Sequence, residues 1–338
     1  MMQSQSQGPG GQSQTQSRPT ERPVLLGRTA AGLFWMFRYV ERAETLSRAL
    51  EAGLRLALTR AGDAESEWRA ILIAAGQSEA FAASEHPVDA RGVARFVLCD
   101  PAAAPSVAEM IALARTNARA VRTALTREVW ETVNDAHHWA ERELREGALA
   151  PEALPDLLTE IRAYASAIRG AFASTMLRNE IYDFARLGTF VERLDGTARL
   201  LDVKYHVLLP RGEDVGGELD VVQWEQLLRA QQVNRAFMMV HGDDYGAAAV
   251  ADFLILDPRN PRSLAHASDR IRKHLDYLTR SHDGRTGACD IADALDARLS
   301  GRTIGPILEG GLHEFLSGVR EDADRLSDEI AHAYRFFA

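Results

Sequence analysis

Cysteine is scarce in this sequence, since Cys99 and Cys289 are the only two among 338 residues. Two cysteines cannot form the disulfide framework on which small secreted scaffolds depend. Cys99 also lies within an apolar run, where a packed thiol is more common than a reactive one. The composition fits a reducing compartment, and we therefore expect a cytoplasmic protein.

Long apolar runs and an excess of positive charge are missing as well. No stretch approaches the roughly 20 consecutive apolar residues that a membrane-spanning helix requires. The formal net charge of -9 argues against a general binder of nucleic acid or anionic membranes, because such proteins carry basic stripes. We expect neither as a partner. Residues 1–23 are rich in Gln, Ser and Gly without an apolar block, which predicts a disordered tail rather than a signal peptide.

The motifs of several enzyme classes are also absent. The sequence contains no phosphate-binding Gly-rich motif, no nucleophile elbow, no HExxH and no paired CxxC. The Gly-rich stretch 305–311 lacks the lysine and the strand context of a P-loop, so it is interpreted as a loop. We expect no metal and no cofactor, and catalytic candidates are confined to ordinary charged side chains.

Helix-forming residues, by contrast, are abundant. Ala, Leu, Arg and Glu dominate and alternating β-branched runs are scarce, which predicts an all-α protein of about a dozen helices. Long helices are expected over residues 28–59, 180–209 and 223–241. Ser106 followed by Glu109 forms a capping-box sequence that opens another helix.

One charged segment occurs twice. Residues 38–44 read RYVERAE and residues 189–195 read TFVERLD, and an Arg and a Leu follow both copies at the same spacing, so the offset is a constant 151. Further along, residues 96–101 (FVLCDP) match residues 253–258 (FLILDP) at an offset of 157. Landmarks in the same order at a nearly constant offset indicate a tandem duplication of a domain-sized unit.

The duplication predicts an architecture. We expect a multi-helix bundle built from two tandem pseudo-repeats, residues 24–150 and residues 151–338, packed as one unit around a pseudo-twofold axis. The two helices that carry the duplicated segment are expected to meet at the seam between the halves.

The repeated charges lie beside an apolar helix face. With Val40 at the centre of that face, two acids and one arginine form a stripe at its edge, and the second copy repeats the stripe. The stripes consist of Glu41, Glu44 and Arg48 in the first copy and Glu192, Asp195 and Arg199 in the second. The same rotation predicts that Arg42 and Arg193 point to the opposite side.

The stripes have two interpretations. As exposed i,i+4 salt bridges, Glu44 with Arg48 and Asp195 with Arg199 contribute only about 0.3–0.5 kcal/mol each. Partly buried carboxylates need donors, so the two stripes would neutralise each other across the axis. Alternatively, the carboxylates converge on a bound cation or amine, since magnesium prefers hard oxygen ligands.

A basic ladder stands apart from the stripes. Arg115, Arg119 and Arg122 follow at i, i+4 and i+7 on one predicted helix. They either bind a carboxylate or phosphate bidentately or pair with acids of a neighbouring helix.

From Leu25 to Phe337 the sequence resembles the bacterial Alpha-E domain proteins. The resemblance is carried by LGRTA at 26–30, FWM at 34–36, RYVERAE at 38–44, NAR at 117–119, VR at 121–122, EVWE at 128–131, FVER at 190–193 and LDPRNPRS at 256–263. It implies an all-helical protein, often encoded with or fused to a circularly permuted ATP-grasp ligase and a transglutaminase-like protein, in systems associated with peptide or amide-bond synthesis. Arg186 stands where the first half has Trp35, so the copies have diverged.

The residues support three functional hypotheses. In the first, a non-catalytic partner of an ATP-grasp ligase presents a docking or substrate-holding surface. In the second, a helical amide or aminoacyl transferase uses Glu41 or Glu44 as a general base of raised pKa and Arg48 as an anion clamp. The third is a structural homodimer. The charged residues assigned to the network or binding surface are Arg28, Arg38, Arg42, Arg48, Arg119, Arg122, Glu192, Arg193, Asp195 and Arg199.

Overall fold

The computed structural model describes residues 25–59, 64–103, 105–145, 151–207, 217–282 and 284–337. Within these ranges it contains fifteen α-helices, two short 3-10 helices and no β-strand, which confirms the all-α prediction. The tail expected over residues 1–23 lies outside the described residues.

The helices grouped as the first half are α1 (Gly27–Thr59), α2 (Ala64–Ala75), α3 (Ser78–Ala82), α4 (Ala90–Cys99), α5 (Val107–Ala120), α6 (Arg127–Glu143) and α7 (Leu154–Thr175), with 3-10 turns η1 (Arg122–Ala124) and η2 (Pro151–Ala153). Helix α7 and η2 fall within residues 151–338 of the predicted second repeat, but α7 packs against α1 and α6 and is therefore grouped with them. Those of the second half are α8 (Glu180–Val207), α9 (Glu218–Ala230), α10 (Asn234–His241), α11 (Ala247–Ile255), α12 (Leu264–Thr279), α13 (Gly287–Leu299), α14 (Ile304–Glu309) and α15 (Leu312–Ala333).

Serine and threonine caps fix several helix starts. The Ser106 hydroxyl accepts a hydrogen bond from the Glu109 amide at 3.3 Å and opens α5. Ser263, at the corresponding place in the second half, caps α12 in the same way. Such caps satisfy amide donors that have no partner inside the helix, so the predicted start of α5 is confirmed.

Two local predictions were wrong. The helix expected over residues 223–241 is divided into α9 and α10, because Gln232 between them has a φ of 57°. An L-residue in the left-handed region cannot continue a right-handed helix. The Gly-rich stretch predicted to be a loop contains the short helix α14.

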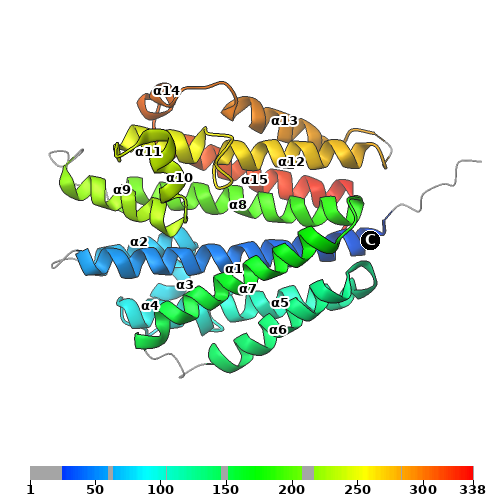
Figure 1. The fold of residues 1–338 in the computed structure, drawn as a ribbon, viewed down its shortest axis with the longest axis horizontal. Coiled ribbons are helices and arrows are strands. Elements are labelled where there is room, and N and C mark those ends of the chain that lie inside the picture. Colours follow the sequence, from blue (N-terminus) through cyan, green and yellow to red (C-terminus); the bar gives the residue numbers. More distant parts are fainter. Residues whose placement is uncertain are drawn as a thin grey trace, which may run out of the picture.

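The centre of the molecule is the pair α1 and α8, which lie side by side (Figure 1). A Cβ added to Gly188 on α8 would come within 2.1 Å of the backbone oxygen of Phe34 on α1. The absence of a side chain at Gly188 therefore allows the two backbones to approach closely. As expected, the two helices that carry the duplicated segment meet.

The layers around this pair correspond between the halves. Helix α1 packs against α5 and α7, with α6 outside them, while α8 packs against α12 and α15, with α13 outside them. Each half also reaches across, since α2 contacts α8 and α9 contacts α1. This order of contacts is what a duplication predicts, but the duplication itself remains a prediction from the sequence.

None of the described helices is both long enough and apolar enough to traverse a bilayer.

Candidate functional site

The duplicated acids lie in two clusters along the α1–α8 seam. The first cluster consists of Glu41, Glu44, Arg48, Arg169, Arg193 and Arg262. The second consists of Glu192, Asp195, Asp202, Arg38, Arg42, Arg199 and Arg320. The four acids of the predicted stripes are thus divided between two sites and do not converge on one point.

Glu41 is the centre of the first cluster, and it is 0% exposed. Arg193 on α8 donates from Nε to Oε1 at 2.8 Å and from Nη2 to Oε2 at 2.9 Å. Arg262, in the loop before α12, donates to Oε1 at 2.8 Å, and Arg169 on α7 donates to Oε2 at 3.1 Å. Each carboxylate oxygen accepts two charge-assisted hydrogen bonds, which are the strong kind.

Glu44, one turn further along α1, is equally buried. Arg48 Nε donates to its Oε1 at 3.0 Å, and Arg262 Nη2 donates to the same oxygen at 2.6 Å. Arg169 forms an ion pair with the other oxygen. The fork of Arg262 therefore bridges both glutamates, which matches the bidentate geometry of a guanidinium.

The second cluster repeats part of this arrangement. Arg38 on α1 donates to Glu192 Oε2 at 3.0 Å, and Arg199 donates to Asp195 Oδ2 at 2.7 Å. Arg320 on α15 lies 3.6 Å from Asp195 and 3.8 Å from Asp202. The predicted i,i+4 pairs are therefore present in both copies, although they are buried or nearly so rather than exposed.

Both helices contain a Glu followed directly by an Arg, and the Arg of each helix faces the Glu of the other. These are called the crossed pairs. Arg193 on α8 binds Glu41 on α1 at 2.8 Å, and Arg42 on α1 lies 3.7 Å from Glu192 on α8. The prediction that the two arginines point away was wrong for Arg193, which is 8% exposed. The prediction assumed that each helix has a single apolar face and that residues opposite it point to solvent. A central helix is instead surrounded by packed neighbours on several sides.

The two clusters differ in charge. Four guanidiniums surround the two carboxylates of the first cluster, which leaves two positive charges in excess. In the second cluster four arginines face three acids, with Asp324 nearby, whose pKa is raised by burial and by Asp195. Arg262 accounts for part of the difference, because Pro105 occupies its place in the first half at the offset of 157.

The arginines also control the ionisation of the buried acids. Burial by itself would raise the pKa of Glu41, but Arg193, Arg262 and Arg169 outweigh it and hold that pKa well below its usual range. At Glu44, burial and the negative charge of Glu41 would also raise the pKa. Three guanidiniums outweigh both and lower the pKa to about 2, those of Arg262, Arg169 and Arg48. The transferase hypothesis requires a general base of raised pKa here, whereas both glutamates have lowered pKa values.

Two arginines of the first cluster were not found from the sequence. Arg169 lies on α7, outside the duplicated segment, and nothing in the pattern around it signals the contact. Arg262 lies in the segment 256–263 that carried the family resemblance, which was a usable signal. Neither could be assigned to Glu41 without knowing which elements pack on α1.

The remaining predicted arginines lie elsewhere. Arg119 is exposed on α5, and Arg122 falls on η1, because α5 ends at Ala120. The Arg122 guanidinium lies 5.4 Å from the Trp130 ring centroid and that of Arg115 lies 5.9 Å from it. Arg115 also donates from Nε to Asn134 Oδ1 at 2.8 Å. The contacts described for Arg115 and Arg122 are thus with an indole and an amide, and none of them is with an acid of a neighbouring helix.

Arg28 lines a surface cleft of about 630 Å³ at the start of α1. Arg285 and Arg335 line the same cleft, and Arg28 is exposed. The described contacts of Arg28, Arg119 and Arg122 include neither acidic cluster.

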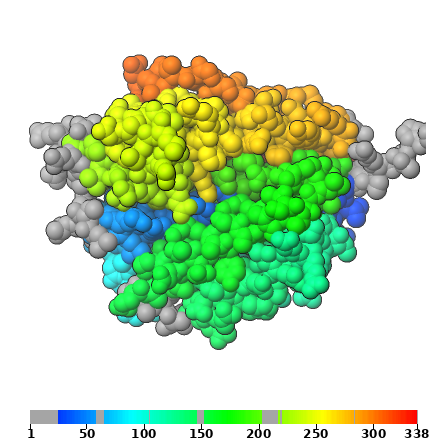
Figure 2. All heavy atoms as spheres, in the orientation of Figure 1, coloured from blue at the N-terminus to red at the C-terminus, as the bar shows by residue number. Residues whose placement is uncertain are grey.

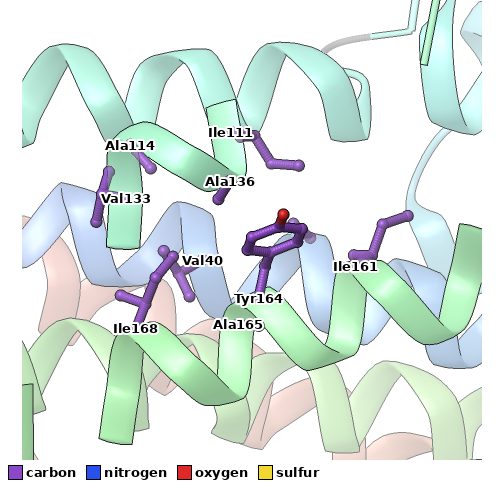
Figure 3. Close-up of a pocket in the computed structure, with 10 residues that line it drawn as sticks. Val40, Ile111, Ala114, Val133, Ala136, Ile161, Tyr164, Ala165 and Ile168 are labelled. Atoms are coloured by element: carbon purple, nitrogen blue, oxygen red, sulfur yellow. The ribbon is translucent and has the colours of Figure 1, made fainter. Parts of the chain in front are cut away.

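A small gap lies beside the first cluster, between α1, α5, α6 and α7 (Figure 3). Its lining is almost entirely apolar, including Val40, Ala136 and Ile168, with the Tyr164 hydroxyl as a polar group. Its volume of about 20 Å³ is enough for about one water molecule, so it has no room for a substrate. Across the described ranges, no group of three His, Cys, Asp or Glu side chains is arranged to hold a metal ion.

Comparison with known proteins identifies the family. The Alpha-E family model, described as a predicted alpha-helical domain with a conserved ER motif, matches residues 25–335. In this chain the crossed pairs Glu41-Arg42 and Glu192-Arg193 have that Glu-Arg sequence. No solved structure matches the chain.

Three longer mycobacterial proteins are similar in sequence. Uncharacterized proteins of Mycobacterium bovis and of Mycobacterium tuberculosis strain CDC 1551 / Oshkosh are each 26% identical to the chain, and one of Mycobacterium tuberculosis strain H37Rv is 25% identical. Each match covers 83% of this chain and 36% of the relative. The chain therefore spans little more than a third of the length of these relatives.

Proposed function

The chain belongs to the Alpha-E family, and on this basis we propose that it is a non-catalytic helical partner of an ATP-grasp-type ligase that forms peptide or amide bonds. It offers the ligase a docking surface, holds the ligase's substrate, or does both. We also propose a transglutaminase-like protein as a second partner, because the family resemblance implies one.

The observation that carries the proposal is that guanidiniums close off every carboxylate of the two stripes. A general base has to take up a proton near the working pH, whereas Glu44 has a pKa of about 2. Glu41 and Glu44 are both 0% exposed, so a substrate has no direct access to them. A network of this kind fixes the seam between α1 and α8, which suits a rigid scaffold.

The exposed arginines supply a surface on which a partner can dock. Arg119 is exposed, and Arg122 and Arg115 lie against the half-buried Trp130. Arginine and tryptophan are enriched among the residues that dominate binding energy at protein interfaces. A cationic and aromatic surface of this kind favours an acidic patch on the ligase.

The length of the relatives agrees with this proposal. In the three mycobacterial proteins the matched region is 36% of the whole, so it is joined to a larger amount of other sequence. A helical module that works beside a second activity fits such an arrangement.

Association of the purified chain with the ATP-grasp ligase encoded beside it tests the proposal. We expect the two to elute together in gel filtration and ligase turnover to rise when the chain is added. The double variant Arg119→Glu, Arg122→Glu should abolish co-elution, while Arg127→Glu, an exposed α6 arginine, should not. The proposal would be wrong if the chain and the ligase eluted separately and ligase turnover did not change when the chain was added.

The same samples test the other two hypotheses. Turnover by the chain alone, lost in Glu44→Gln with unchanged helicity, would favour the transferase. A chain that elutes only as a dimer and does not change ligase turnover would favour the structural homodimer.

A further inference from the structure

The surface cleft lined by Arg28 lies apart from both acidic clusters, since no residue of either cluster lines it. Its volume of about 630 Å³ is in the range of small-molecule sites. Three segments form its walls: the start of α1, the loop between α12 and α13, and the end of α15 with the two residues that follow it. The cleft therefore depends on parts of the chain that are far apart in sequence.

A backbone contact at Gly27 brings two of these walls together. A Cβ added to Gly27 would lie 2.0 Å from the backbone oxygen of Arg335 and 2.9 Å from that of Tyr334. The absence of a side chain at Gly27 thus lets α1 begin against the end of α15. Figure 1 shows the C-terminal end of the chain beside the start of α1. Arg28, the next residue on α1, and Arg335 therefore line the same cleft.

The acids beside the cleft are already engaged. Glu180 at the start of α8 accepts a hydrogen bond from the Leu25 amide at 3.2 Å. Asp290 and Asp293 on α13 lie 3.3 Å and 2.5 Å from Arg285. These contacts hold two walls of the cleft, and they neutralise Arg285.

Arg28 and Arg335 remain without counterions. Both are exposed, and among the described residues neither of them forms an ion pair or a hydrogen bond through its side chain. The first turn of α1 adds to their positive charge, because it contains no acidic residue and a helix N-terminus has a positive dipole end and free amide donors. In a chain with a net charge of -9, this is a local site for an anion.

Two polar atoms in the wall of the cleft are buried without a hydrogen bond, the Tyr334 hydroxyl and His282 Nε2. Tyr334 is 7% exposed, and His282 Nε2 lies 3.6 Å from Glu180. Burial raises the pKa of Tyr334 to about 12, and Thr286 offsets this only in part, so the hydroxyl keeps its proton. A buried donor without an acceptor costs free energy, which an acceptor in the cleft would recover.

We propose that this cleft binds a small molecule that combines a carboxylate with a compact apolar body. The carboxylate lies between Arg28 and Arg335 at the start of α1, where guanidinium forks and helix amides both donate to it. The apolar body packs against Leu25, Leu26 and Ala333, which line the same cleft. The inference deepens the substrate-holding role of the proposed function and rests on it, because a ligase that forms amide bonds joins a carboxylate to an amine.

Titration calorimetry on the whole chain tests the inference with N-acetyl-leucine as the probe, at constant ionic strength set by sodium chloride. We expect saturable binding of about one molecule per chain. N-acetyl-leucinamide has the same body without the charge, and it should bind roughly tenfold more weakly or less, because its charge-assisted hydrogen bonds are lost. Equal affinity for the acid and the amide would overturn the inference, and this comparison needs no variant.

Inorganic phosphate is the third probe, because it has the charge without the apolar body. We expect it to bind more weakly than N-acetyl-leucine. Tighter binding of phosphate would overturn the assignment of a carboxylate ligand and would indicate a site for bare anions.

The double variant Arg28→Gln, Arg335→Gln should weaken the binding of N-acetyl-leucine roughly tenfold or more. Neither arginine holds a described carboxylate, so the variant is expected to fold, and circular dichroism checks this. The control Arg91→Gln, Arg127→Gln removes two exposed charges from α4 and α6 and should bind as the parent does. Absence of saturable binding to the parent, or parental affinity in the folded double variant, would overturn the inference. Co-elution with the ligase is measured separately and would be unaffected by that result.

Discussion

At the scale of single residues, the acids of the duplicated segment are buried together with their counterions. Glu41 accepts four hydrogen bonds from three arginines that come from three different parts of the chain. Burying an ion pair gains little net stability, but removing one partner leaves an uncompensated charge. The acids are therefore more important for fixing the arrangement than for adding free energy.

Glu41→Gln should lower the free energy of unfolding by about 3–5 kcal/mol, because Arg193 and Arg262 would lose their charged partner in a buried site. Urea denaturation followed by circular dichroism measures the change. Glu65→Gln is the matched control, since Glu65 and Arg69 form an i,i+4 pair with both side chains 60% exposed. It should cost no more than about 0.5 kcal/mol. Equal losses in the two variants would contradict this account.

Glu44 makes stability depend on pH. Its pKa is about 2 in the folded chain, against 4.5 for an ordinary glutamate. Because the folded pKa is the lower one, the stability it contributes is fully present above about pH 4.5 and is lost as the pH falls towards 2. Glu41 acts in the same direction. Urea midpoints should therefore fall over this range, and Glu44→Gln should reduce the slope; an unchanged slope would argue against the assignment.

At the scale of elements, the close approach of α1 and α8 depends on a glycine. Gly188→Ala would bring a methyl group to 2.1 Å from the Phe34 backbone oxygen, and we expect it to destabilise the chain by about 1–3 kcal/mol. Thermal unfolding measures this. Gly170→Ala on α7 has no heavy atom within 4 Å of the new Cβ and should stabilise the chain by roughly 0.5–1 kcal/mol. Destabilisation by both changes would point to helix distortion and not to the seam.

Helix extents could be predicted well where composition alone decides them. The first long helix was expected over residues 28–59 and runs from Gly27 to Thr59. The break at Gln232 could not be foreseen, since neither glycine nor proline marks the residue whose positive φ ends α9. Likewise, the repeated pattern predicted which acids matter, but the contacts of Arg169 and Arg262 depend on how α7 and the loop before α12 pack on α1.

At the scale of the whole molecule, the halves exchange contacts in both directions. Glu41 of the first half is bound by Arg193 of the second, and Arg38 of the first half binds Glu192 of the second. If one half unfolded or separated from the other, charged side chains in the remaining half would lose their partners. This interdependence predicts that the chain unfolds as one cooperative unit.

The distribution of tryptophan provides the measurement. Of the five tryptophans, only Trp224 belongs to the second half, so fluorescence reports mainly on the first half, whereas far-ultraviolet circular dichroism reports on both. The two urea transitions should coincide, as required of a two-state process. Separated midpoints would indicate that the halves are independent domains.

The distance along the chain between Glu41 and its partners also has a consequence for synthesis. The last of them, Arg262, lies 221 residues further on, so a ribosome has made most of the protein before the fork that joins Glu41 to Glu44 exists. Until then, packing α1 into its final environment would bury carboxylates without their counterions. The nascent first half is therefore expected to stay loosely packed and dependent on chaperones until translation is well into the second half.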